Sequence, residues 1–253
     1  MYNPFSLENK IILITGASSV IGRQCAIDCS KMKARVILIG RCEQRLDETL
    51  GLMEGNEHLV VPFDLTDSQN IKTMVSSAVK AMGPIDGVLH CAGISNVLPL
   101  KMMKIDTIEK FFHTNVYSAI ELTREICSIN NVSRRGASIV FFSSIMGCVG
   151  ESGKSLFSMT KGALIAAARS LACEYSKKLI RFNCVSPGAI LTPINETLPH
   201  MVDPESRKAL ADRHFLGLGE CSDISSACIY LLSEASRWVT GQNFIIDGGY
   251  TAR

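Results

Sequence analysis

The residues from Thr15 to Gly22 have the composition of a phosphate-binding turn. The segment reads Thr15-Gly16-Ala17-Ser18-Ser19-Val20-Ile21-Gly22 and lies between a predicted strand at 11–15 and a predicted helix at 22–32. At such a junction the unpaired N–H groups of the helix N-terminus point toward a bound anion. A pair of glycines alone is a weak signal, so the prediction of a pyrophosphate site rests on their position between strand and helix.

Arg41 follows the second predicted strand and indicates which dinucleotide this turn would hold. A site for NAD(H) needs an acidic side chain about 20 residues beyond the glycine turn, where it bonds the ribose hydroxyls. The sequence has Gly40 and Arg41 there instead. A guanidinium suits a 2′-phosphate, which favours NADP(H) over NAD(H). The alternative is that Arg41 is an ordinary surface arginine.

These residues need a scaffold, and the apolar pattern predicts one. Short, nearly continuous apolar segments occur at 11–15, 35–39, 59–63, 87–91, 137–142, 181–185 and 243–246. Longer segments of helical periodicity separate them, at 22–32, 71–82, 111–129, 157–175 and 224–232. Such alternation is typical of a parallel sheet buried on both faces. Seven strands, with a glycine turn after the first, favour an α/β fold with a doubly wound, Rossmann-like sheet over an eight-stranded barrel.

The chain is predicted to form a single domain over residues 1–253. No linker and no internal repeat interrupts the alternation of strands and helices. The segment 188–219 has the weakest regular pattern and contains Pro193, Pro199 and Pro204, with a short helix expected around 204–213. Long irregular insertions after a strand often cover an active site, so this segment is predicted to be a lid over the substrate.

Composition excludes several classes of protein. The 26 basic and 24 acidic residues give a net charge of +2, too balanced for a nucleic-acid-binding surface. No apolar run is long enough to span a bilayer, and residues 1–10 lack the pattern of a secretion signal, so we expect a cytoplasmic protein. The ten scattered cysteines are then expected to be reduced thiols, and the five histidines have no ligand spacing that would predict a metal site.

A further series of residues follows the predicted strands in a fixed order. It consists of Asp64, Ala92-Gly93, Asn115, Ser144, Lys161, Asn183, Pro187-Gly188, Thr192 and Asp247-Gly248-Gly249. With the glycine turn, this series resembles the classical short-chain dehydrogenase/reductase family over residues 7–250. The resemblance implies a Rossmann-like sheet that binds a nicotinamide dinucleotide. It also implies hydride transfer to or from a carbonyl or alcohol carbon.

The resemblance assigns roles to individual residues. Asn115 would support a proton-relay water, Ser144 would orient the substrate oxygen, and Lys161 would hold the nicotinamide ribose. Asp64 resembles the family aspartate that contacts the adenine amino group, although a helix N-cap would explain it as well. The residues implied to bind the cofactor are Gly16, Ser18, Ser19, Val20, Ile21, Gly22, Arg41, Asp64, Leu65, Cys91, Ala92, Gly93, Lys161, Pro187, Gly188, Ile190 and Thr192.

The sequence departs from the family at its catalytic acid. The family places a tyrosine four residues before the lysine, and this chain has Phe157 there. The related enoyl reductases place their tyrosine seven residues before the lysine, and this chain has Lys154 there. A phenylalanine ring has no hydroxyl, so it can neither donate a proton to an alkoxide nor accept one from an alcohol. Ser144 or a lysine-bound water would be a poor substitute.

Two departures concern the cofactor site. Val20 stands where the family turn has a glycine, and its β-branched side chain is expected to crowd the phosphates or displace the turn. The fourth strand ends in His90-Cys91-Ala92-Gly93, where the family has two asparagines before the small pair. His90 is interpreted as a strand-end histidine with its hydrogen bonds satisfied rather than as a catalytic group.

Two functions therefore compete. The first is an NADP(H)-dependent oxidoreductase with impaired activity, and the second is a catalytically inactive homologue that binds a ligand or regulates a partner. Phe157 is compatible with an impaired natural enzyme, an engineered substitution, or a chemistry that needs no phenol. The resemblance also implies a homo-oligomer, a tetramer or a dimer, in which the predicted helices 111–129 and 157–175 pair across a two-fold axis. The apolar residues of these helices, which exceed what one sheet face requires, agree with this.

Overall fold

The computed structural model describes residues 2–191 and 202–252. Seven parallel strands form one sheet in the order β3-β2-β1-β4-β5-β6-β7, which confirms the predicted doubly wound fold. The strands are β1 Ile11–Thr15, β2 Arg35–Gly40, β3 Leu59–Pro62, β4 Gly87–His90, β5 Ala137–Phe142, β6 Ile180–Pro187 and β7 Asn243–Ile246. Because the strand order reverses between β1 and β4, a crevice opens at their carboxyl ends.

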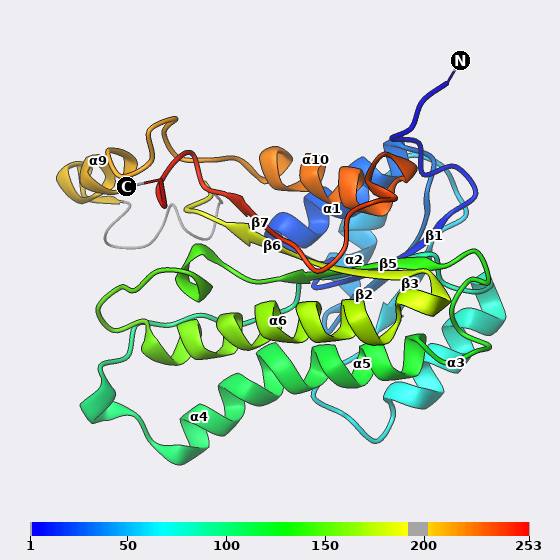
Figure 1. The fold of residues 1–253 in the computed structure, drawn as a ribbon, viewed down its shortest axis with the longest axis horizontal. Helices are drawn as coiled ribbons and strands as arrows, with labels where there is room; N and C mark the ends of the chain where they lie inside the picture. The colour runs from blue at the N-terminus through cyan, green and yellow to red at the C-terminus, as the bar shows by residue number, and fades with distance from the viewer. Residues whose placement is uncertain (1, 192–201, 253) are drawn as a thin grey trace.

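Helices cover both faces of the sheet (Figure 1). Alternate residues of each strand point to opposite faces, so the strands supply two apolar clusters. Leu13 and Ile37 pack with α3, α5 and α6, whereas Ile12 and Val36 pack with α1, α2 and α10. The helices are α1 Val20–Lys31, α2 Glu43–Leu50, α3 Ile71–Met82, α4 Ile105–Phe112, α5 Ser118–Ile126, α6 Ser155–Glu174, α9 Pro204–Ala211 and α10 Cys221–Leu232.

The structure corrects two helix predictions. The long helix expected at 111–129 begins at Ile105 and ends at Ile126, and a π-helical turn over His113–Tyr117 joins α4 to α5. The second correction is α2, which the sequence pattern did not predict. Its eight residues include only two apolar side chains, Leu46 and Leu50, which pack against the core one turn apart.

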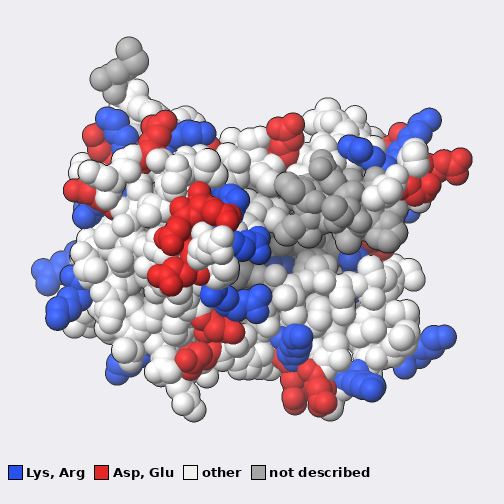
Figure 2. All heavy atoms as spheres, turned by 180° about the vertical axis from the view of Figure 1, so that it is seen from behind, with Lys and Arg blue, Asp and Glu red and all other residues white. Residues whose placement is uncertain are grey.

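Charged side chains of both signs are interspersed over the face in Figure 2, with no extended surface of one sign in that view. Within the described parts of the chain, no helix is long and apolar enough to cross a membrane. The short helix expected in the predicted lid is present as α9. Residues 192–201 of that segment lie outside the described residues, so its role as a lid stays a prediction.

Candidate active site and cofactor cavity

A cavity of about 830 Å³ lies at the carboxyl edge of the sheet, at the crevice between β1 and β4. Its walls come from the turn after β1, from the ends of β2, β3 and β4, and from α4. The lining residues are Gly16, Ser18, Ser19, Val20, Ile21, Gly22, Gly40, Arg41, Phe63, Asp64, Leu65, Thr66, Cys91, Ala92, Gly93, Ile94, Lys110, His113 and Thr114. The structure thus brings together all the predicted cofactor residues that lie before residue 94.

The turn after β1 depends on the absence of side chains at Gly16 and Gly22. Gly16 has a φ of +66°, and a Cβ there would lie 3.0 Å from the Ala92 nitrogen, so the turn packs directly on the end of β4. A Cβ on Gly22 would collide with the Gly16 carbonyl oxygen. Ser19 precedes α1 in an extended conformation and makes no side-chain cap. The first N–H groups of α1 therefore remain available to an anion in the cavity.

Val20 occupies this turn in an unusual backbone conformation. Its φ is +51°, in the left-handed region that favours glycine. A residue with a branched Cβ is rare there, and the conformation costs roughly 1–3 kcal/mol. The helix α1 nevertheless begins at Val20, and the predicted glycine turn is formed. The turn is therefore strained at Val20 without being displaced, and the other expected effect, crowding of the phosphates, stays a prediction.

Arg41 and Asp64 lie on the wall formed by the ends of β2 and β3. Arg41 is exposed at this wall, so its guanidinium can meet a phosphate. Asp64 accepts hydrogen bonds from the Thr66 N–H at 2.9 Å and from the Thr66 hydroxyl at 2.8 Å. These bonds, together with the positive charge of Arg41, hold the pKa of the Asp64 carboxyl below its usual range.

The alternative role of Asp64 as a helix N-cap is wrong. The next helix, α3, begins at Ile71 and has Asn70 at its N-cap position, so Asp64 lies too far upstream, as do its neighbours Thr66 and Asp67. The Asp64 carboxylate instead closes a local turn with Thr66. The same side chain lines the cavity, where it can also accept a bond from a ligand.

The segment after β4 connects the cavity to the predicted catalytic residues. The Ala92 N–H donates to the Thr15 hydroxyl at 3.1 Å, which ties the ends of β1 and β4 together. A Cβ on Gly93 would lie 3.3 Å from Asn115 Oδ1 and 3.4 Å from Lys161 Nζ. Gly93 is therefore the point at which the cofactor cavity meets the side chains of Asn115 and Lys161.

His90 ends β4 and is buried behind this wall. Its Nε2 lies 3.0 Å from the Thr123 hydroxyl, and its ring stacks on Phe141 with centroids 5.0 Å apart. Burial lowers the pKa of His90 to about 3, so the imidazole is neutral at physiological pH. This geometry agrees with the interpretation of His90 as a satisfied strand-end histidine.

Asn115 lies within the π-helical turn between α4 and α5 and is almost fully buried. Its Oδ1 accepts from the Ile94 N–H at 2.8 Å, and its Nδ2 donates to the Ile94 carbonyl at 2.9 Å and to the Thr160 hydroxyl at 3.1 Å. The side chain thus holds the loop after β4 against α6. π-Helical turns are rare and occur mainly at functional sites.

Lys161 extends from α6 toward the same point. Its Nζ donates to the Phe142 carbonyl at 2.7 Å and lies 5.5 Å from the centroid of the Phe157 ring. Burial lowers the pKa of the Lys161 ammonium to about 8, against the opposing effect of the Cys91 and Cys184 thiols. A second ammonium, that of Lys154, lies 5.9 Å from the same ring centroid, so Phe157 is in contact with two lysines.

Ser144 follows β5 and precedes a 3₁₀ turn over Ile145–Gly147, where its Oγ accepts from the Met146 N–H at 3.2 Å. The neighbouring Ser143 hydroxyl donates to the Lys161 carbonyl at 2.9 Å, which fixes this turn against α6. Ser144, Phe157 and Lys161 therefore come from two segments that pack on each other. The structure gives Ser144 no bond to Phe157 or Lys161.

Three further predicted cofactor residues lie away from the cavity walls. Pro187 ends β6, the Gly188 N–H donates to the Ile246 carbonyl at 2.9 Å, and Ile190 bridges to Gly219. None of the three lines the 830 Å³ cavity. Thr192 lies outside the described residues. The nicotinamide wall implied by the resemblance is thus a prediction that the cavity neither includes nor contradicts.

Sequence reasoning missed the contribution of α4 and the turn after it to the cavity. Lys110, His113 and Thr114 lie three and four residues apart on one helical face and line the cavity together with Arg41 and Asp64. The spacing is visible in the sequence, but nothing in it indicates that this face turns toward the glycine turn. Two of these three side chains can carry positive charge, which suits a phosphate-bearing ligand.

Comparisons with known proteins agree with this fold and site. The family model described as "Enoyl-(Acyl carrier protein) reductase" matches residues 16–251. The chain is 33% identical to a glucose 1-dehydrogenase of Gluconobacter oxydans, covering 96% of this chain and 92% of the relative. It is 32% identical to a 3-oxoacyl-[acyl-carrier-protein] reductase of Thermotoga maritima, covering 96% and 98%.

Solved structures give the same result. A short-chain type dehydrogenase/reductase from Mycobacterium ulcerans superposes with a TM-score of 0.89 at 26% identity, covering 98% of this chain and 92% of that one. The family model spans nearly the whole sheet, and relatives above 30% identity match from end to end. The chain is therefore an oxidoreductase scaffold of the short-chain dehydrogenase/reductase family.

Proposed function

We propose that the protein is an NADP(H)-dependent oxidoreductase acting on a carbonyl or alcohol substrate, and that its proton-transfer step is impaired. The observation that carries this proposal is the Phe157 ring beside Lys161 Nζ, at 5.5 Å, where a phenol would complete the acid–base group. The nicotinamide cofactor, when bound, would supply or accept the hydride. Everything else in the reaction depends on how the chain's own side chains hold the substrate oxygen and move a proton.

The cofactor cavity fits a dinucleotide by its shape and its donors. Gly16 and Gly22 allow the turn to lie close to a pyrophosphate, and the N–H groups at the start of α1 face the same space. Asp64 would accept from an adenine amino group, and Arg41 would meet a 2′-phosphate. Val20 is the one residue of the turn that works against the fit, because it lines the cavity on a strained backbone.

At the predicted reaction centre, proton transfer has no obvious donor. Phe157 keeps the ring but has no hydroxyl, and Ser144 has a hydroxyl whose own pKa is too high for efficient acid–base catalysis. Lys161 has a pKa of about 8, so its ammonium is the most acidic group at this point near neutral pH. Its bond to the Phe142 carbonyl holds the ammonium in place, which suits a ribose-binding role better than proton donation.

The cofactor preference is tested by measuring affinity without catalysis. We expect NADPH to bind more tightly than NADH in calorimetry, and Arg41→Ala to remove most of this preference, on the order of 1–3 kcal/mol. Arg45→Ala is the matched control, because Arg45 is an exposed arginine four residues away that does not line the cavity. Equal affinities in the unmodified protein, or a preference that survives Arg41→Ala, would contradict the assignment.

The second function, a catalytically inactive homologue that binds a ligand, is favoured by the same Lys161 contact. An ammonium that already donates to a backbone carbonyl, beside a ring that cannot titrate, is consistent with a binding site without turnover. Reduction of carbonyl compounds at ordinary enzymatic rates by the unmodified protein would exclude this alternative. The homo-oligomer, the cytoplasmic location and the lid at 188–219 remain predictions from the sequence.

A further inference from the structure

A second cavity, of about 740 Å³, lies at the opposite edge of the sheet, where the strands begin. We call it the amino-edge cavity. The residues that line it are Asn3, Ser6, Glu8, Asn9, Lys10, Asp86, Arg135, Gly136, Ala137, Ser138, Ala172, Ser176, Leu179, Ile180, Arg181, Leu232, Glu234, Arg237, Trp238, Val239 and Thr240. Its volume falls within the range of roughly 300–1,000 Å³ that small-molecule sites occupy.

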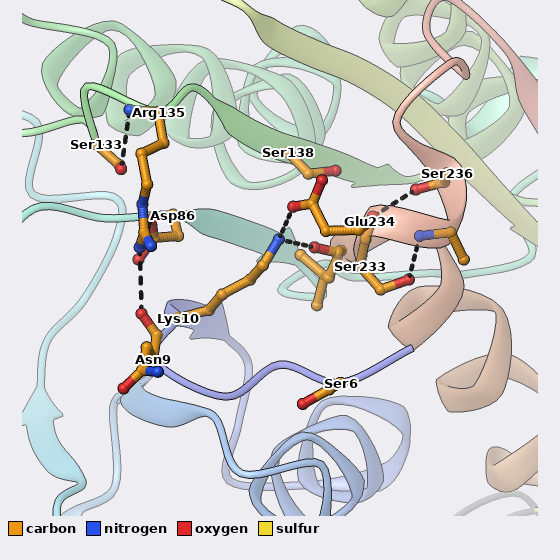
Figure 3. A network of polar contacts seen from close by, with 12 residues as sticks. Ser6, Asn9, Lys10, Asp86, Ser133, Arg135, Ser138, Ser233, Glu234 and Ser236 are labelled. Atoms are coloured by element: carbon orange, nitrogen blue, oxygen red, sulfur yellow. Dashed lines mark hydrogen bonds and ion pairs between the residues drawn. The ribbon is translucent and has the colours of Figure 1, made fainter. Parts of the chain in front are cut away.

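Some of the charged side chains that line this cavity already form ion pairs with one another. Figure 3 shows Lys10 and Glu234 pointing toward one another, and Arg135 pointing toward Asp86. The corresponding N···O distances are 2.8 Å and 3.1 Å. The third carboxylate of the lining, that of Glu8, pairs at 3.3 Å with Lys33, which lies outside the cavity. All three carboxylates of the lining are thus engaged by cations other than Arg181 and Arg237.

Arg181 and Arg237 add two further positive charges to the lining, and neither guanidinium lies within ion-pair distance of a carboxylate of the described residues. In the described parts of the chain, no ion pair includes either residue. Arg181 uses two of its five donors, to the Val239 carbonyl at 3.2 Å and the Leu231 carbonyl at 2.7 Å. Burial lowers the pKa of Arg181, and the negative charge of Glu234 opposes this shift without cancelling it. An anion in the cavity would relieve this cost.

The lining also includes two large apolar side chains that the folded chain leaves exposed. Leu179 is 67% exposed and Trp238 is 91% exposed, although both are large apolar side chains. Leu179 has a φ of +57°, in the left-handed region, and a Cβ on Gly136 would collide with the Leu179 carbonyl oxygen. The backbones at Gly136 and Leu179 are thus in close contact, and both residues line the cavity. Strained residues of this kind cluster at ligand sites.

We propose that the amino-edge cavity binds an amphipathic monocarboxylate, with its carboxylate on Arg181 and Arg237 and its apolar tail along Leu179 and Trp238. A guanidinium binds a carboxylate through two parallel hydrogen bonds, and Arg181 has open donors for this arrangement. The site is separate from the cofactor cavity, because the two lie at opposite ends of the same parallel strands. It does not depend on the function proposed above.

Trp238 makes this proposal directly measurable. It is the only tryptophan in the chain, so its fluorescence reports the cavity mouth alone. We expect decanoate to shift the emission to shorter wavelength, to protect it from acrylamide quenching, and to do both saturably. Decanol, which has the same tail without the charge, should bind on the order of tenfold more weakly.

Three variants separate the head-group contact from the apolar one. Arg237→Ala should weaken decanoate on the order of tenfold and leave decanol unchanged. Leu179→Gly should weaken both probes while the fold is kept, because glycine adopts the left-handed conformation freely. Arg207→Ala, a change at an exposed arginine on α9 outside the lining, should alter neither.

Several results would overturn the proposal. One is the absence of a saturable change in Trp238 emission with either probe. Another is equal binding of decanoate and decanol, which would show that the arginines contribute nothing. A third is protection of Trp238 that rises with protein concentration and ignores both probes, because a second copy of the chain would then cover the cavity.

Discussion

The two edges of the sheet carry cavities of similar volume but opposite construction. The carboxyl edge is lined by glycines, a strained turn and the uncapped N–H groups at the start of α1, which can bond a ligand in the cavity. The amino edge is lined in part by side-chain ion pairs, Lys10 with Glu234 and Arg135 with Asp86. The amino edge thus carries side chains paired within the protein, and the carboxyl edge carries backbone donors available to a ligand. Substitutions at the two edges should therefore change different measured quantities.

The largest effect is expected at the carboxyl edge, from Phe157→Tyr. The new phenol would lie beside the Lys161 ammonium, whose charge would lower the phenol pKa. If Phe157 replaces the catalytic acid, kcat with NADPH should rise by about 10²–10⁴-fold against carbonyl substrates. Steady-state rates on a panel of aldehydes, ketones and acyl thioesters measure this.

Two controls define that experiment. Phe157→Leu should leave every rate at the level of the unmodified protein, because leucine also lacks a hydroxyl. If Phe157→Tyr leaves all rates at background while NADPH still binds, the pocket has diverged in more than the phenol, and the inactive-homologue function becomes the better account.

A change at the amino edge should affect stability and leave the cofactor site alone. Asp86 is buried, and its carboxylate accepts from the Ile11 N–H at 2.9 Å as well as from Arg135. Asp86→Ala leaves the first N–H of β1 without its acceptor and should lower the free energy of unfolding by about 2–3 kcal/mol. Urea denaturation gives this value, and calorimetry should show an unchanged affinity for NADPH.

Arg135→Ala is the matched control for Asp86. The Arg135 side chain is 70% exposed, so its loss should cost less than about 1 kcal/mol. Equal losses of stability for the two variants would mean that the ion pair, and not the buried N–H bond, is what Asp86 contributes.

A pH effect is expected from the buried His90. Its folded pKa is about 3, against an ordinary value of 6.5, so the unfolded chain binds a proton in this range and the folded chain does not. Stability is therefore lost as pH falls from 6.5 toward 3, by about 2 kcal/mol at pH 5. Urea denaturation of the unmodified protein and His90→Gln, each at pH 7 and pH 5, should show this loss only when the histidine is present. A loss of the same size in His90→Gln would assign it to other groups.

The smallest of these effects is expected at the glycine turn. Val20→Gly removes a side chain from the cavity wall and should tighten NADPH binding by about 1–2 kcal/mol in calorimetry, with little change in kcat. The backbone strain at a φ of +51° is present with or without the cofactor, so its relief should appear in urea denaturation as a higher free energy of unfolding. Val20→Ala keeps a Cβ in the same conformation and should give part of the gain in affinity but no such gain in stability; an unchanged NADPH affinity in both variants would show that the valine does not crowd the phosphates.

The strands of the sheet are well predicted from the sequence, because a strand buried on both faces is a nearly continuous run of apolar residues. The predicted bounds of β1, β5 and β7 match those of the structure, since each apolar segment ends at a polar or glycine turn. The helix α2 escapes prediction because it is short and mostly polar, and only two leucines anchor it. The π-helical turn at Asn115 could not be predicted from the helical periodicity of the apolar residues. It occurs where the Asn115 side chain bonds Ile94 and Thr160, which lie on other segments of the chain.

The candidate site is predictable where its residues directly follow the strands, and not where it depends on how a helix packs. Residues that follow parallel strands must meet at one edge, so the glycine turn, Arg41 and Asp64 are expected to lie together, as they do. The contribution of Lys110 and His113 depends on how α4 lies over that edge, which only the folded chain shows. Residues that precede parallel strands must likewise meet at the opposite edge, but nothing in their sequence marks the amino-edge cavity as a ligand site.

The backbone conformation of Val20 bears on how this turn could change by mutation. Its left-handed conformation is the one that glycine adopts without steric cost, so loss of the side chain would require no rebuilding of the loop. Valine and glycine codons differ at a single base, and so do phenylalanine and tyrosine codons. Val20→Gly and Phe157→Tyr are therefore each one point mutation away, and a population of genes under selection for turnover would sample both.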